Sequence, residues 1–157
     1  MSNSTLTTNF NYLSPKGFKL SIDTTQFANV EYFMTSFTLP AVSMGSIEVN
    51  YRSAKGALPG DKIDYAEISA RFLVDENMAN YIEVFNWMHS NITSATIAQE
   101  DMILSVLDSH NQVSQQFRFL NAFPISLAAL DFNAQNQEVE YMQSDISFKY
   151  DRFELVS

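Results

Sequence analysis

The chain has 157 residues, a length typical of one compact domain with a substantial core. Hydrophobic residues make up 46% of it and charged residues only 17%, which excludes a disordered tail protein. The formal net charge of -9 disfavours a sequence-reading nucleic-acid binder, because such proteins gain affinity by neutralising phosphates. The lack of Cys excludes disulfides, thiolate zinc sites and cysteine nucleophiles.

The N-terminus shows no basic segment followed by an apolar run, and no stretch approaches the roughly 18 apolar residues of a membrane helix. We therefore expect neither a secretory signal nor a membrane span. Residues 1–14 are rich in Ser, Thr and Asn without a sustained period. They predict a flexible N-terminal arm, followed by a single domain over residues 15–157.

Three strands are predicted in the first third of the domain. Apolar and polar residues alternate over Phe18–Asp23 and again over Ser46–Arg52, and an aromatic segment between them, Val30–Leu39, is stopped by Pro40. The polar stretch that follows, residues 53–62, contains two Gly and one Pro. It predicts a long loop or the tip of a protruding hairpin.

A fourth strand and one helix come next. Residues 68–74 alternate, and the period then changes to three and four, which predicts an amphipathic helix over about residues 76–89. Asp75 is expected to be its N-cap and Glu76 to lie in its first turn. Asn80 is expected on the polar face, and the apolar face is expected to consist of Met78, Tyr81, Ile82, Phe85 and Met88.

Trp87 falls off this apolar stripe, on the side opposite Phe85. Two interpretations stay open for it: a residue in a second layer of the core, or a contact with another subunit. Phe85, Trp87 and Met88 are therefore candidates for either packing or an interface.

The last third of the chain predicts further strands. A hairpin runs from Met102 to Phe119 with His110 and Asn111 in its turn, Pro124 is expected to break the chain, and a last strand covers Glu138–Val156. The apolar residues of that strand change phase, which predicts a bulge near residues 143–145. The whole pattern predicts a mainly β protein: an antiparallel β-sandwich or barrel with one amphipathic helix after the fourth strand.

No motif for nucleotide binding, serine hydrolysis or zinc proteolysis is present in the sequence. Asp61 and Asp64 beside Gly60 have too few oxygen-bearing neighbours for a calcium loop and are better explained as a solvated turn. We expect no catalytic residue, no metal site and no cofactor, and hence no enzyme.

The order of these features resembles the tail tube family of contractile-tailed bacteriophages. The resemblance rests on an aromatic strand ending in Leu39-Pro40-Ala41, a loop with Pro59-Gly60-Asp61, and Val74-Asp75-Glu76 leading into a helix that reaches Trp87. It continues through Phe123-Pro124 to a closing strand rich in aromatic residues and covers roughly residues 17–156. Type VI secretion tube proteins are related to this family in fold.

The resemblance implies a structural protein of the virion tail, assembled in the host cytoplasm as hexameric rings that stack into a tube. DNA would pass through the lumen without specific binding, and the sheath, baseplate and tail-terminator proteins would be partners. The loop after the third strand would reach neighbouring subunits. Its candidate residues are Arg52, Lys55, Pro59, Gly60, Asp61 and Lys62.

Two alternatives remain open at this point. Residues 1–16 match no feature of the family, which would suit a baseplate or tail-end ring that starts or caps the tube. A carbohydrate-binding β-sandwich that stacks sugars on exposed Tyr and Trp side chains, Trp87 among them, belongs to a different functional class.

Overall fold

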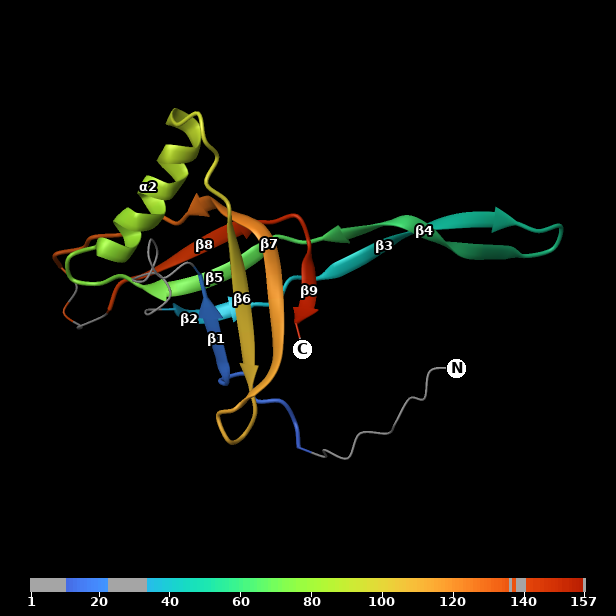
Figure 1. The fold of residues 1–157 in the computed structure, drawn as a ribbon, viewed down its shortest axis with the longest axis horizontal. Helices are drawn as coiled ribbons and strands as arrows, with labels where there is room; N and C mark the ends of the chain where they lie inside the picture. Colours follow the sequence, from blue (N-terminus) through green and yellow to red (C-terminus); the bar gives the residue numbers. More distant parts are fainter. Residues whose placement is uncertain (1–10, 23–33, 136, 138–140, 157) are drawn as a thin grey trace.

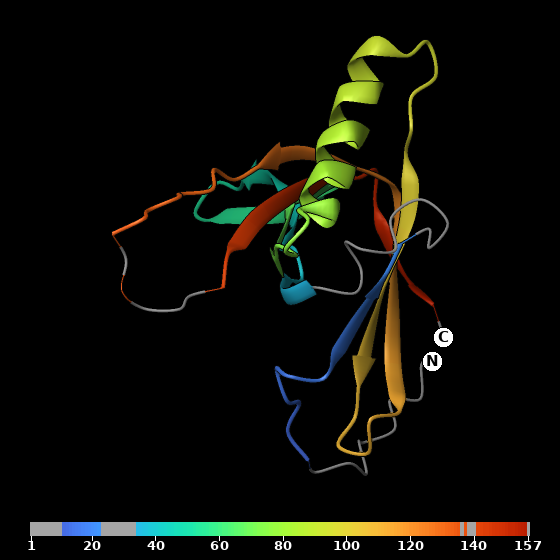
Figure 2. The same cartoon turned by 90° about the vertical axis from the view of Figure 1, so that its left-hand side faces the viewer.

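The fold is known from a computed structural model, which describes residues 11–22, 34–135, 137 and 141–156. In these residues a long, bent strand joins two halves of a seven-stranded antiparallel sheet, and a separate two-stranded hairpin projects from the body (Figures 1 and 2). The mainly β fold with one helix is thus confirmed. The arm predicted over residues 1–14 falls mostly outside the described residues and stays a prediction.

The first half of the sheet consists of β1 (Phe18–Ser21), β6 (Glu100–Leu107), β9 (Phe153–Val156) and the first part of β7 (Val113–Leu127). The β6–β7 hairpin confirms the predicted turn. Asn111 has a φ of 59°, a left-handed conformation that Asn tolerates well, and the Asp108 carboxylate accepts the N–H groups of His110 and Gln112.

The second half consists of β2 (Met34–Thr38), β5 (Ile68–Leu73), β8 (Gln143–Lys149) and the end of β7. The prediction that Pro124 breaks the chain is wrong, because β7 continues through it to Leu127. By that point β7 has left β6 and β9 and is paired only with β8, so Pro124 lies on an edge strand where its missing N–H costs little.

The single predicted C-terminal strand is two strands, β8 and β9, separated by a turn at residues 150–152. The β5–β8 pairing runs from Leu73–Gln143 to Ile68–Phe148 without a shift, so the bulge predicted near residues 143–145 is wrong. No bulge is needed, because Tyr141 is 82% exposed and its phase need not match the core. Val139, the other residue of that phase, lies outside the described residues.

The helix α2 (Ala79–Thr93) begins three residues later than predicted and extends four residues further. Met78 precedes it with a left-handed φ of 56°, so Asp75 and Glu76 lie before the helix and not at its cap and first turn. The Asp75 carboxylate nevertheless accepts the N–H of Ala79 at 2.8 Å. It therefore satisfies one free donor of the first turn from outside the helix.

The buried face of α2 also differs from the prediction. Val84, Trp87 and Asn80 are buried, whereas Ile82 and Phe85 are about half exposed. Asn80 is accommodated because its amide donates to the Leu73 carbonyl, while its oxygen accepts the N–H groups of Asp75 and Tyr81. These bonds hold the start of the helix against the end of β5.

The core lies between the two halves of the sheet and α2. Cross-strand partners such as Ile68 and Phe148 are completely buried together, and the Trp87 ring packs against Phe148 with centroids 6.0 Å apart. Phe119 connects the two halves through ring contacts with Phe37, Tyr150 and Phe153. The hairpin β3–β4 contributes no residue to this core, although Tyr65 at its base makes ring contacts with Tyr150 and Phe153 at the edge of the core.

Candidate subunit interface

The hairpin is formed by β3 (Val42–Asn50) and β4 (Lys55–Tyr65) and extends far from the rest of the molecule (Figure 1). Residues 55–65 therefore form a strand, so the long-loop interpretation of residues 53–62 is wrong and the protruding-hairpin interpretation is correct. Because β4 is an additional strand, β5, which leads into the helix, is the fifth strand of the chain and not the fourth. A sequence of Gly, Pro and charged residues forms a strand here because β3 pairs with it on both sides of a register shift.

Almost every side chain of the hairpin is at least partly exposed, including large apolar ones. Ile47 lies directly opposite Leu58, and Met44 opposite Ile63. Each of these four is between 51% and 57% exposed. An isolated two-stranded hairpin is marginally stable in water, and a contiguous apolar surface marks a site of interaction. The hairpin thus has the properties of an interface element that a partner covers.

A close crossing interrupts the hairpin midway. The register shifts between Met44 and Ser46, and Gly60 comes so close to Gly45 that a Cβ on Gly60 would lie 2.5 Å from the Gly45 carbonyl oxygen. A Cβ on Gly45 would meet nothing within 4 Å. Gly60 is therefore required for this crossing, while Gly45 is not.

The structure divides the predicted loop residues between the tip and the strand. Arg52 lies in the tip, which is closed by a 2.8 Å hydrogen bond from the Tyr51 N–H to the Ala54 carbonyl. Lys55 begins β4, and Pro59, Gly60, Asp61 and Lys62 lie within it. Within the described part of the chain, the charged members of this set take part in no ion pair.

The three helix candidates have different surroundings. Trp87 is only 3% exposed, and its indole N–H donates to the Ala98 carbonyl at 2.9 Å, so it belongs to the core. Met88 is half-buried and packs against the core, whereas Phe85 is 55% exposed and stacks on His89. Of the three, Phe85 has the exposure that an intermolecular contact requires.

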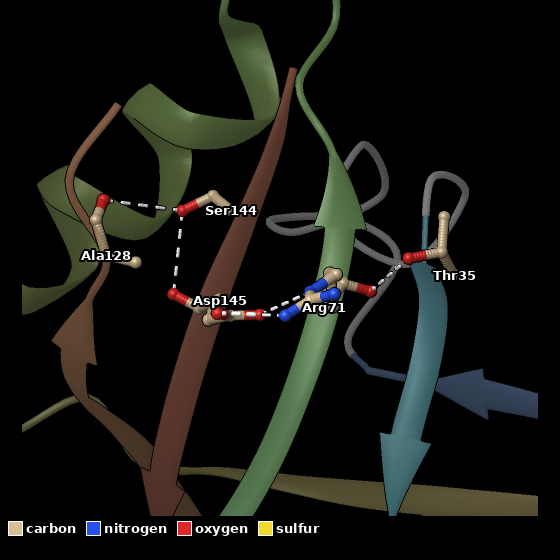
Figure 3. A network of polar contacts seen from close by, with 5 residues as sticks. All are labelled: Thr35, Arg71, Ala128, Ser144 and Asp145. Atoms are coloured by element: carbon tan, nitrogen blue, oxygen red, sulfur yellow. Dashed lines mark hydrogen bonds and ion pairs between the residues drawn. The ribbon is translucent and has the colours of Figure 1, made fainter. Parts of the chain in front are cut away.

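The outer face of the second half of the sheet is polar. Arg71 on β5 forms a double contact with the Asp145 carboxylate on β8, and the Thr35 hydroxyl on β2 donates to the Arg71 carbonyl (Figure 3). The hydrogen bond and charge of Arg71 hold the pKa of Asp145 below its usual value, and Asp145 in turn raises the pKa of Arg71. Because the pair is exposed, its main effect is to neutralise this face.

Asp101 organises the corner where β7 bends. Partial burial raises the pKa of this carboxyl, but the N–H of Asn121 and the guanidinium of Arg118 outweigh that effect and leave the pKa below its usual value. The Arg118–Asp101 contact is 2.7 Å long, and Asn121 has a φ of 55°. These interactions fix the bend.

Some residues of the interface were not identified from the sequence. The sequence does not predict the pairs Ile47–Leu58 and Met44–Ile63, because Leu58 lies in a stretch that is otherwise mostly polar. The signal was present in the period-two alternation of Ser46–Arg52, which needs a partner strand. In the described residues no group of three or more His, Asp or Glu is placed to hold a metal ion, and no helix has the length and apolarity to cross a membrane.

Known proteins share this architecture. Three solved structures share the fold at low identity. The cap of the anti-feeding prophage, described as its tube-terminating cap, has a TM-score of 0.73 at 18% identity over 100% of this chain and 99% of the other. The PVC sheath–tube complex of an extracellular contractile injection system, in the extended state, has a TM-score of 0.73 at 19% identity, covering 100% and 99%. A type six secretion system protein has a TM-score of 0.52 at 11% identity, covering 88% and 81%.

A search of curated proteins finds no match. The model of one protein family, described as T4-like virus tail tube protein gp19, matches residues 17–154. The match covers the whole described fold from just before β1 into β9, including the projecting hairpin and the helix. The chain therefore belongs to the tail tube family of T4-like viruses.

Proposed function

We propose that this chain forms the inner tube of a contractile tail by assembling into hexameric rings that stack around a channel. The projecting β3–β4 hairpin is the observation that carries the proposal. Its exposed apolar pairs have no cover within the described chain, and membership of a family of structural tail tube proteins makes further copies of the chain the natural partner. That family is not a class of enzymes.

The sheet edges offer a second means of assembly. Within the described residues, β1, β2 and β9 each pair with one strand only. Free edges can extend a sheet into a neighbouring subunit, and a closed ring removes the aggregation hazard that such edges present. We propose that edge pairing closes the ring and that the hairpins connect a subunit to its neighbours.

The net charge of -9 suits a conduit for DNA. Phosphates bind proteins mainly through Lys and Arg, so an acidic surface avoids an attraction that would slow the passage of the polyanion. In this proposal the ring assembles in the host cytoplasm, and the finished tube contacts the sheath, the baseplate and a terminator.

The test is electron microscopy with negative stain and sedimentation of the concentrated, purified chain. Rings or tubes are expected for the wild type, while the double substitution Ile47→Ser with Leu58→Ser should leave it folded but unassembled. Ser69→Ala with Ser147→Ala, on an opposed pair of the sheet body, provides the matched control. A wild-type chain that stays monomeric at every concentration would contradict the proposal.

A tube-terminating ring is the second candidate, favoured by the likeness to the anti-feeding prophage cap. The number of copies per particle separates the two: many rings indicate the bulk tube, and one or two rings indicate a terminus. The carbohydrate-binding alternative loses its main support, because Trp87 is buried in the core and cannot stack on a sugar.

A further inference from the structure

The molecule carries a projection at one end of its long axis and a pocket at the other. The tip of the β3–β4 hairpin forms one extremity, and the segment that connects β5 to α2 lies at the opposite side of the body (Figure 1). Nine residues of β3 at about 3.3 Å each give a reach of roughly 30 Å. The tip is thus directed away from the pocket of its own chain and towards a neighbour.

The pocket has a volume of about 750 Å³ and lies between the end of β5, the segment that leads into α2, and residues 130, 132, 141 and 142. Most of its wall is apolar, and Phe132 at its rim is 76% exposed. Asp75 and Glu76 also line it. Their apolar companions are Leu73, Val74, Met78, Leu130, Phe132, Tyr141 and Met142.

The acidic wall is preorganised. The side chain of Asn80 holds the backbone at Leu73 and Asp75, and the Asp75 carboxylate is fixed by its bond to the Ala79 N–H. Glu76 is exposed and, within the described residues, pairs with no cation of its own chain. The wall therefore presents negative charge beside an apolar cavity, ready for a ligand that combines an aromatic or aliphatic group with a positive one.

The hairpin tip has the complementary composition. Tyr51 is 63% exposed, and its ring lies beside Gly56, where a Cβ would come within 2.7 Å of the ring carbon Cε2. Arg52 within the turn and Lys55 directly after it are both exposed, and neither forms an ion pair in the described chain. An amphipathic Tyr flanked by two cations matches the pocket in both polarity and charge.

We propose that the tip of one copy docks into this pocket of a second copy, with Tyr51 in the apolar cavity and Arg52 and Lys55 facing Asp75 and Glu76. The contact rests on the proposed self-assembly and names the surface that receives the hairpin. Because projection and pocket are different surfaces, the contact is head-to-tail, and each copy both gives and receives a tip. Such contacts generate rings or open filaments.

The test uses charge reversal at two exposed positions of the full chain, Arg52→Glu and Glu76→Arg, with assembly measured by sedimentation and electron microscopy. Each variant alone should raise the concentration needed for assembly by roughly tenfold or more, because every contact then opposes like charges. An equimolar mixture should assemble like the wild type, since alternating copies restore opposite charges at every contact.

The matched control uses Arg152→Glu in place of Arg52→Glu. This variant also reverses an exposed positive charge, at a position far along the chain from the tip. R152E alone should assemble like the wild type, because its tip and its pocket are unchanged. Adding it to E76R should leave most E76R copies unassembled, because every altered pocket still meets Arg52. Circular dichroism of each variant verifies that it is folded.

Four outcomes would overturn the contact. If both single variants assemble like the wild type, or if the R52E and E76R mixture fails to recover, the tip and the pocket are not partners, while the proposed tube function stands. If E76R alone blocks assembly and R52E does not, the pocket receives a different surface of the neighbour. A wild-type chain that never assembles would overturn the tube function and this contact together.

Discussion

At the scale of single residues, the main surprise is a buried polar side chain. Asn80 is completely buried, yet each of its hydrogen-bonding groups is used, by Leu73, Asp75 and Tyr81. A buried polar group is tolerated only when it is hydrogen-bonded, and the loss of one partner leaves the others desolvated. Asn80 thus fixes both the start of α2 and the acidic wall of the pocket.

Replacing Asn80 by Ala should lower the free energy of unfolding by about 2 kcal/mol, because several backbone groups lose their partner in a dry environment. The measurement is urea unfolding of the unassembled chain, followed by the fluorescence of the single, buried Trp87. Asn86→Ala on the exposed side of the same helix is the control and should change stability by less than about 0.5 kcal/mol. Equal effects of the two substitutions would contradict this role.

Asp108 makes one contribution to stability depend on pH. The N–H groups of Gln112 and His110 hold the pKa of this carboxyl below its ordinary value of 3.8. Because the folded pKa is the lower one, the carboxylate stabilises the fold above pH 3.8, and the benefit is lost as the pH falls through the folded pKa.

Asp108→Asn keeps an oxygen for both N–H groups but cannot titrate. We expect the urea midpoint of this variant to fall less steeply than that of the wild type below about pH 4. Parallel curves for the two proteins would show that the turn does not favour the ionised form.

At the scale of elements, the hairpin β3–β4 is the part whose shape depends most on sequence detail. Its crossing requires that Gly60 approach the Gly45 carbonyl without a Cβ between them. The strands on both sides of the crossing bear the exposed apolar pairs. A change in the angle between β3 and β4 at this point therefore displaces the outer half of the hairpin relative to any partner surface.

Gly60→Ala should weaken assembly while leaving the melting temperature of the body nearly unchanged, since the hairpin shares no core with it. Gly45→Ala is a closely matched control, because its Cβ meets nothing within 4 Å. Sedimentation of the two variants at equal concentration gives the comparison. If G45A impairs assembly as much as G60A, the close approach at Gly60 is not the determinant.

Most of the strand pattern and the single helix were predictable from hydrophobic periodicity, because β5, β8 and most of β1 alternate between a more buried face and a more exposed face. The errors arose where tertiary context overrides a local signal. Pro124 continues a strand because it lies at a sheet edge, and residues 55–65 form a strand despite their Gly and Pro because β3 pairs with them over nearly their whole length.

The helix shows the same limit for the interface. Phe85 and Ile82 follow the apolar stripe but are exposed, while Asn80 follows the polar stripe and is buried. Periodicity identifies an amphipathic helix but does not reveal whether its apolar stripe faces the core of its own chain or another molecule. The pocket beside α2 could not be predicted from the sequence either, since it depends on how residues 73–78 meet residues 130, 132, 141 and 142.

At the scale of the whole molecule, the shape itself indicates assembly. A body with a complete core carries a long hairpin with exposed apolar side chains on one side and an apolar pocket with acidic residues on the other. The edge strands, which pair on one side only within the described residues, and membership of the tail tube family are consistent with the same conclusion. In the proposed tube, the hairpin is the intermolecular element that joins copies of this chain.

Electron cryo-microscopy of particles assembled from the full-length chain tests that claim most directly, at a resolution that traces the backbone. We expect stacked rings in which the β3–β4 hairpin of every copy is covered by a neighbouring copy, with Ile47 and Leu58 no longer exposed. Assemblies in which the hairpin remains surrounded by solvent, or a chain that stays monomeric, would contradict it.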